Sequence, residues 1–126
     1  MKILVVDDEP YMQRLLQYQL ERAGFEALTA GTGAEGVEAA REEEPALIIL
    51  DYMLPEMDGL AALKLIRAQP ANRLTPVIML TANPGRVTAA EAERCGATLF
   101  VTKPYSPSQL LRDVRRLTEA GDTPAP

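Results

Sequence analysis

The sequence predicts an α/β protein in which helices cover both faces of one open, parallel, five-stranded sheet. Five apolar runs of strand length alternate with five segments of helical periodicity, and Pro, Gly or Asp bounds each run. This alternation is typical of parallel sheets with right-handed crossover connections. The run at residues 46–50 is apolar at every position, which for a strand indicates burial on both faces.

The first half of the chain predicts two strand–helix pairs. The first strand is expected at residues 2–6, and the helix after it begins at Pro10, a residue that is favoured in the first turn. Gly24 is a natural end for that helix. A shorter second strand is expected at residues 25–29, and the next helix begins near Gly33.

The middle of the chain predicts two further pairs. The third strand is expected at residues 46–50, and Asp58 precedes a helix whose apolar residues recur at helical spacing. The fourth strand is expected at residues 76–80. The helix after it, at about residues 85–95, is rich in Ala and poor in large apolar residues, so we expect it to be the least tightly packed helix.

The last strand is expected at residues 98–102, and Ser106 is suited to cap the final helix. That helix carries an apolar stripe at helical spacing, formed by Leu110, Leu111, Val114 and Leu117. The length of 126 residues suits one domain. We expect the domain to occupy residues 1–119 and residues 120–126 to form a disordered tail or the remnant of a linker.

The composition excludes several classes of function. The chain has no His, which excludes Ser-His-Asp triads and His-ligated zinc sites. The formal net charge of −5 has the wrong sign for binding nucleic acid backbones. One Cys cannot form an internal disulfide, no apolar run approaches the ~20 residues that span a bilayer, and the start does not resemble a signal peptide. We therefore expect a cytoplasmic protein with no membrane or nucleic acid partner.

Polar residues follow four of the five predicted strands. Asp7 and Asp8 follow the first, Asp51 the third, Thr81 the fourth and Lys103 the fifth. Ligand sites of such sheets lie beyond the carboxyl ends of the strands, so these residues are expected to meet at one edge. Three neighbouring carboxylates repel one another, and a bound cation would offset that repulsion. Oxygen ligands without His or Cys favour Mg²⁺.

Some of these polar residues also have an ordinary structural explanation. An Asp after a strand often caps a turn or a helix, which is the role that we expect for Asp58. Thr81 alone could be a strand-end residue, and Lys103 alone could be a solvated surface lysine. Capping does not account for the grouping of Asp7, Asp8 and Asp51 at the ends of the first and third strands.

Four motifs, taken in order, resemble the receiver domain of two-component response regulators, in its single-domain chemotaxis-regulator form. The resemblance covers about residues 2–119 and implies a flavodoxin-like (βα)5 doubly wound sheet of strand order 2-1-3-4-5. The motifs are Val6-Asp7-Asp8, the run DYMLPEMDG at residues 51–59, Thr81-Ala82 and Lys103-Pro104.

The resemblance implies that Asp51 is the phosphoacceptor, which receives a phosphoryl group from a histidine kinase or a small phosphodonor. It also implies a Mg²⁺ cofactor, ligated directly by Asp8 and Asp51, through water by Asp7, and by the backbone carbonyl of Met53. This assignment agrees with the chemistry, because a carboxylate that attacks phosphorus needs nearby positive charge rather than proton transfer.

The resemblance further implies a switch. Thr81 would bond one phosphoryl oxygen, Lys103 would pair with another, and Pro104 would set the geometry of the loop. Movement of Thr81 would open a space for the aromatic side chain of Phe100, and the fourth helix, fifth strand and fifth helix would form the surface that a partner recognises. Phe100 replaces the more frequent Tyr of the family, so it has no hydroxyl group to report the switched state.

The implied protein is a regulator rather than an enzyme, because it promotes only its own phosphorylation and dephosphorylation. Its output would be a downstream protein or an attached output domain, and it would be a monomer or a phosphorylation-dependent dimer. Ala97 and Thr98 replace an acidic pair that many transcriptional regulators use in a symmetric dimer, which argues against that dimer here.

Two other classes of function share parts of this pattern. A Mg²⁺-dependent phosphatase with an Asp nucleophile would need a second Asp two residues later, where Met53 stands. A flavin or nucleotide carrier would need a glycine-rich loop after the first strand, where Asp7, Asp8, Glu9 and Pro10 stand instead.

The positions that tune hydrolysis in this family are occupied here by Met53 and Asn83. Because a thioether is only a weak hydrogen-bond acceptor, Met53 is poorly suited to orient an attacking water. We expect a phosphoryl lifetime at the longer end of the family range. The measurement is the loss of label from purified protein after removal of the kinase, and rapid loss would contradict this expectation.

Overall fold

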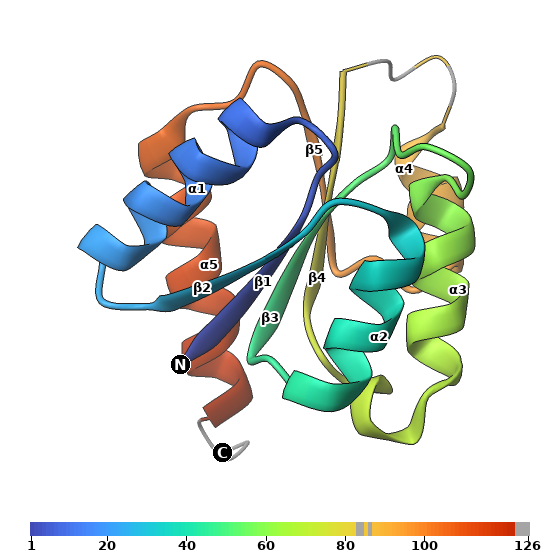
Figure 1. Ribbon diagram of the computed structural model, residues 1–126, viewed down its shortest axis with the longest axis horizontal. Helices are drawn as coiled ribbons and strands as arrows, with labels where there is room; N and C mark the ends of the chain where they lie inside the picture. The colour runs from blue at the N-terminus through green and yellow to red at the C-terminus, as the bar shows by residue number, and fades with distance from the viewer. Residues whose placement is uncertain (83–84, 86, 123–126) are drawn as a thin grey trace.

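Five parallel strands form one sheet of order β2-β1-β3-β4-β5 in the computed structural model, which describes residues 1–82, 85 and 87–122 (Figure 1). Every neighbouring pair of strands is parallel. The predicted fold class and strand order are therefore confirmed, and each strand lies within one residue of its predicted limits. The strands are β1 (Lys2–Val6), β2 (Glu26–Ala30), β3 (Leu47–Asp51), β4 (Val77–Thr81) and β5 (Leu99–Thr102).

Helices cover both faces of the sheet (Figure 1). The helices are α1 (Pro10–Arg22), α2 (Gly33–Glu43), α3 (Gly59–Ala68), α4 (Ala89–Arg94) and α5 (Pro107–Asp122), with a short 3-10 helix η1 (Pro70–Asn72) after α3. The two faces of the sheet bury different side chains, because successive strand residues point to opposite sides. Ile3, Val5 and Ile49 pack under α1 and α5, whereas Leu4, Val6 and Leu50 pack under α2 and α3.

Several predicted helix boundaries are confirmed. Gly24 follows α1 with φ of 98°, a conformation that glycine adopts at little cost. Asp58 caps α3, because its Oδ1 accepts a hydrogen bond of 2.9 Å from the backbone N–H of Ala61. Ser106 does the same for α5, where its Oγ accepts from the N–H of Gln109 at 3.3 Å.

Two helices differ from the expected limits. Helix α4 is shorter than residues 85–95, because Thr88 caps its start and Gly96, with φ of 108°, follows its end. Helix α5 continues to Asp122 and so includes part of the segment that we expected to be a tail. The helix continues past Gly121 because a glycine weakens a helix without breaking it. The assignment of residues 120–126 to a tail or linker stays a prediction.

No helix in the described part of the chain is long and apolar enough to cross a membrane.

Arg67 forms a hydrogen-bonded network at the amino end of β4 that the sequence did not predict. Its guanidinium donates to the carbonyl of Gly96 at 2.7 Å and 3.0 Å, and to the carbonyls of Asn72 and Thr75 at 2.8 Å and 2.6 Å. These bonds join the end of α3 to the connections on either side of β4. The side chain thus fixes the turns that precede β4 and β5.

Asn72 is the buried centre of this network. Its side chain is fully buried, donates to the carbonyl of Ala40 at 2.8 Å and accepts from the side chain of Gln69 at 2.7 Å. It therefore links η1 to the end of α2. Removal of such a side chain leaves buried polar groups without a partner, which is costly.

We expect Asn72→Ala to lower the free energy of unfolding by about 1–3 kcal/mol. The measurement is urea unfolding at constant m-value. Leu74→Ala is the control, because Leu74 is 93% exposed and its truncation should change stability by no more than about 0.5 kcal/mol. Equal unfolding midpoints for the two variants would contradict a stabilising role for Asn72.

Candidate functional site

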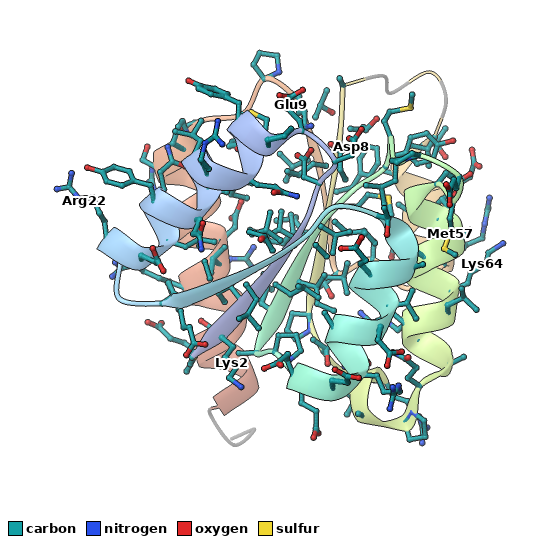
Figure 2. The ribbon with its side chains drawn as sticks, in the orientation of Figure 1. Lys2, Asp8, Glu9, Arg22, Met57 and Lys64 are labelled. Carbon is teal, nitrogen blue, oxygen red and sulfur yellow. The ribbon has the colours of Figure 1, made fainter. Side chains whose placement is uncertain are left out.

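The predicted site residues lie at the carboxyl ends of the strands. Asp51 and Thr81 are the last residues of β3 and β4, and Asp7 and Lys103 directly follow β1 and β5. The register aligns these ends, since Asp51 is paired with Leu80 and Thr81 with Thr102. In Figure 2, Asp8 and Glu9 lie at this edge of the sheet and Lys2 lies at the opposite edge.

Lys103 joins two buried carboxylates. Its Nζ lies 2.7 Å from Oδ2 of Asp51 and 3.8 Å from Oδ2 of Asp7. Asp51 is 5% exposed and Asp7 is 2% exposed. An ammonium group so close to two buried carboxylates offsets part of their mutual repulsion. From the sequence, we expected a bound cation to offset the negative charge of these carboxylates. In the structure, the ammonium of Lys103 provides part of that positive charge.

The remaining carboxylate oxygens differ in their partners. Oδ1 of Asp51 accepts a hydrogen bond of 3.0 Å from the N–H of Met53, and Oδ1 of Asp7 accepts one of 2.9 Å from the N–H of Glu9. Oδ2 of Asp7 is buried without a hydrogen-bond partner among the described residues. Hydrogen-bond donors thus hold both oxygens of Asp51, whereas Oδ2 of Asp7 lies 3.8 Å from the ammonium of Lys103, beyond hydrogen-bond distance.

Burial raises the pKa of Asp7 from 3.8 to about 6. The hydrogen bond from Glu9 opposes this rise in pKa, the negative charge of Asp51 adds to it, and the positive charge of Lys103 opposes it. The folded protein therefore holds the proton of Asp7 more tightly than the unfolded chain does.

These groups fit a hard cation by their chemistry. The candidate ligands are all oxygens, and the buried, unpartnered Oδ2 of Asp7 is the kind of oxygen that a cation would use. Within the described residues, however, no group of three or more acidic, His or Cys side chains is already arranged around one point. The structure brings Asp7 and Asp51 together through Lys103 and leaves Asp8 exposed.

The other predicted residues lie around this cluster. Thr81 is fully buried, and Phe100 is partly buried beside Met79, its neighbour in the sheet. Met53 is 49% exposed, and its backbone N–H donates to Asp51. The Lys103–Pro104 peptide bond is cis. Asn83 lies outside the described residues.

Two side chains near the site were not predicted from the sequence. Tyr105 follows Pro104, and its hydroxyl is buried without a hydrogen-bond partner among the described residues. Burial, and then the charges of Asp7 and Asp51, raise the pKa of Tyr105 to about 12. Gln13 in α1 donates to the backbone carbonyl of Asp7. The position of Tyr105 next to the Lys-Pro motif could have identified it, but no local pattern identifies Gln13.

The same edge of the sheet is hollowed beside Lys103. A mostly apolar cavity of about 560 Å³ lies between α1 and the connection from β5 to α5. Met12 and Leu15 line it from α1, and Lys103 and Tyr105 line it from the other side. Lys103, whose ammonium contacts Asp51, thus also lines this cavity.

In metal-free buffer at pH 8, we expect Asp7→Asn to have a free energy of unfolding about 1–3 kcal/mol higher than that of the wild type. Each unit of difference between the folded and unfolded pKa corresponds to ~1.4 kcal/mol. The pKa of Asp7 is about 6 in the folded protein against 3.8 for the ordinary carboxyl. As the pH rises between these values, the unfolded chain loses this proton first, and the wild type loses stability. The difference should vanish below about pH 4. Urea unfolding against pH measures it, and a difference independent of pH would contradict the raised pKa.

The family model described as the response regulator receiver domain matches residues 3–115. Alkaline phosphatase synthesis transcriptional regulatory protein PhoP of Bacillus subtilis is 40% identical over 125 residues, which are 99% of this chain and 51% of that protein. The chain therefore spans about half the length of this relative.

Solved structures agree with this match. The receiver domain of sensor histidine kinase PA1611 from Pseudomonas aeruginosa, with a magnesium ion coordinated in its active-site cleft, is 30% identical, with a TM-score of 0.86 and coverage of 94% and 97% of the two chains. Chemotaxis protein CheY4 of Vibrio cholerae is 33% identical, with a TM-score of 0.84 and coverage of 92% and 97%. With its motifs, its strand order and these matches in agreement, the chain belongs to the family of response regulator receiver domains.

Proposed function

We propose that this receiver domain is a phosphorylation switch in which Asp51 is the phosphoacceptor. The observation that carries the proposal is the 2.7 Å contact between Oδ2 of Asp51 and Nζ of Lys103 at the carboxyl end of the sheet. This contact places an ammonium group beside the oxygen that would attack.

The chemistry is the transfer of one phosphoryl group from a phosphorylated donor to a carboxylate. A carboxylate oxygen of Asp51 attacks the phosphorus of a phosphohistidine or of a small acyl phosphate and forms a new P–O bond. The bond from phosphorus to the donor breaks, and the donor leaves with that electron pair. Lys103 stabilises the negative charge on the phosphoryl oxygens during this step, as preorganised cations do in phosphoryl transfer.

We further propose that Asp7, Asp8, Asp51 and the carbonyl of Met53 hold Mg²⁺. A bound Mg²⁺ would neutralise charge on the transferring group. Two observations support this set: Oδ2 of Asp7 is buried without a hydrogen-bond partner among the described residues, and the related receiver domain of PA1611 has magnesium in its cleft. Asp8, which is exposed, would have to contribute from the solvent side.

Phosphorylation would act through Thr81 and Phe100. Thr81 is buried at the end of β4, where a hydroxyl could bond a phosphoryl oxygen on Asp51. Phe100, which is only partly buried, could then occupy the space that Thr81 leaves. The surface of α4, β5 and α5 would change and alter binding of a partner. Helix α4, the shortest α-helix in the described part of the chain, offers the least resistance to such repacking.

A histidine kinase would supply the phosphoryl group, as expected for a receiver domain. The output would be either a separate protein or a domain joined to this one, since the chain spans about half the length of PhoP. The domain would act as a monomer or as a phosphorylation-dependent dimer. Receiver domains are regulatory switches, and the alternative of a phosphatase is not favoured, because Met53 stands where a catalytic acid would be needed.

We expect Asp51→Asn to abolish labelling by acetyl phosphate in the presence of Mg²⁺, because an amide oxygen is a poor nucleophile. The measurement is the mass increase of one phosphoryl group and its loss in hydroxylamine. Asp58→Asn is the matched control, since Asp58 lies in the same connection from β3 to α3 but is an N-cap. Asn is an equally good N-cap residue, so this variant should be labelled like the wild type.

Normal labelling of Asp51→Asn would contradict the assignment of the phosphoacceptor. Turnover of the phosphodonor without a protein adduct would instead support the phosphatase.

A further inference from the structure

Gln13 joins two backbone carbonyls at the edge of the sheet that carries the site. Its side-chain amide donates to the carbonyl of Asp7 and, at 3.2 Å, to the carbonyl of Ala30. The carbonyl of Ala30 also accepts a hydrogen bond of 3.0 Å from the N–H of Asp7. The end of β1 is thus held to the end of β2 by the backbone of Asp7 and by the side chain of Gln13.

The same residue closes the turn between β1 and α1. The backbone N–H of Gln13 donates to the carbonyl of Glu9 at 3.0 Å, while its side chain reaches back to the carbonyl of Asp7. The N–H of Glu9 donates to Oδ1 of Asp7 at 2.9 Å. Asp8 lies between these fixed points with an exposed side chain. The place from which the Asp8 carboxylate extends therefore depends on this turn.

We propose that Gln13 is a positioning residue for Asp7 and Asp8 and so sets the affinity of the site for Mg²⁺. This inference rests on the proposed function. Groups that orient metal ligands commonly contribute about 10–100-fold to metal affinity. Gln13 acts through the backbone of the ligands, since its amide bonds the carbonyl of Asp7 and not its carboxylate.

Gln17 provides a comparison within the same helix. It is also partly buried, and its side-chain amide donates to the carbonyl of Ala27 in β2 at 3.3 Å. Gln17 lies one helical turn further along α1, and Ala27 pairs with Ile3 near the start of β1, far from the carboxyl end. If these glutamines only attach α1 to β2, replacing either should have the same consequences. If Gln13 positions the ligands, only its replacement should weaken Mg²⁺ binding.

The experiment compares Gln13→Met and Gln17→Met. The side chain of Met is similar to that of Gln in length and helix propensity, but it has no hydrogen-bond donor. We expect calorimetric titration with MgCl₂ to show about 10-fold weaker binding for Gln13→Met and a change of less than about 2-fold for Gln17→Met. Gln17→Met should be labelled by acetyl phosphate at saturating Mg²⁺ at the rate of the wild type, because Gln17 bonds the carbonyl of Ala27 and no segment that carries a proposed ligand.

A second measurement needs no metal. Amide hydrogen exchange in EDTA should show faster exchange of the Asp7 and Glu9 N–H groups in Gln13→Met than in Gln17→Met. If the wild type binds Mg²⁺ and is labelled, but the two variants bind Mg²⁺ equally well, the role of Gln13 is overturned and the proposed function stands. If the wild type neither binds Mg²⁺ nor is labelled, both proposals are overturned.

Discussion

The burial of two carboxylates, Asp51 and Asp7, beside the ammonium of Lys103 is the constraint that the rest of the structure has to satisfy. These carboxylates are buried, and buried charges are costly unless an opposite charge lies close to them. The chain brings the three groups from β1, β3 and β5, which are distant in sequence, and only a complete parallel sheet places those strand ends together. The aliphatic side chains packed on both faces of β1, β3 and β4 stabilise the fold and offset the free-energy cost of burying these charges. Core and site are therefore two parts of one arrangement: the core fixes the strands, and the strands fix the charges.

The sequence predicted those parts of the molecule that local patterns determine. Residues 46–50 are apolar throughout, and β3 is buried at each of its positions. Asp58 and Ser106 cap the helices that they were expected to cap. The clustering of Asp7, Asp51 and Lys103 also followed from pattern, because the carboxyl ends of parallel strands share one edge. In each of these cases, a short run of residues or the order of the strands is enough to predict the structural feature.

The features that the sequence did not predict depend on contacts between distant segments. Arg67 bonds the carbonyl of Gly96, and Asn72 bonds the carbonyl of Ala40, and every backbone residue offers the same carbonyl group. When a side chain forms a hydrogen bond with the backbone of another segment, the sequence of that segment does not reveal the bond. The same reason explains why the sequence did not identify Gln13 as a residue near the site. The limits of α4 were wrong for a local reason, since Thr88 begins the helix later than the Ala-rich composition suggested.

The groups around Asp51 indicate the kind of reaction that this site can support. They are an ammonium and a backbone amide, which stabilise negative charge without moving a proton. The chain also has no His, the side chain most often used for proton transfer near neutral pH. Such a site suits a reaction whose donor already has a good leaving group, so that the receiving protein needs to supply only a nucleophile and positive charge. A phosphorylated histidine or an acyl phosphate meets that condition, whereas an ordinary phosphate ester would need an acid to protonate its leaving oxygen. If Asp51 is the phosphoacceptor, as proposed, such a site would select its donors by their chemical reactivity, and selection among different kinases would come from the surface around it.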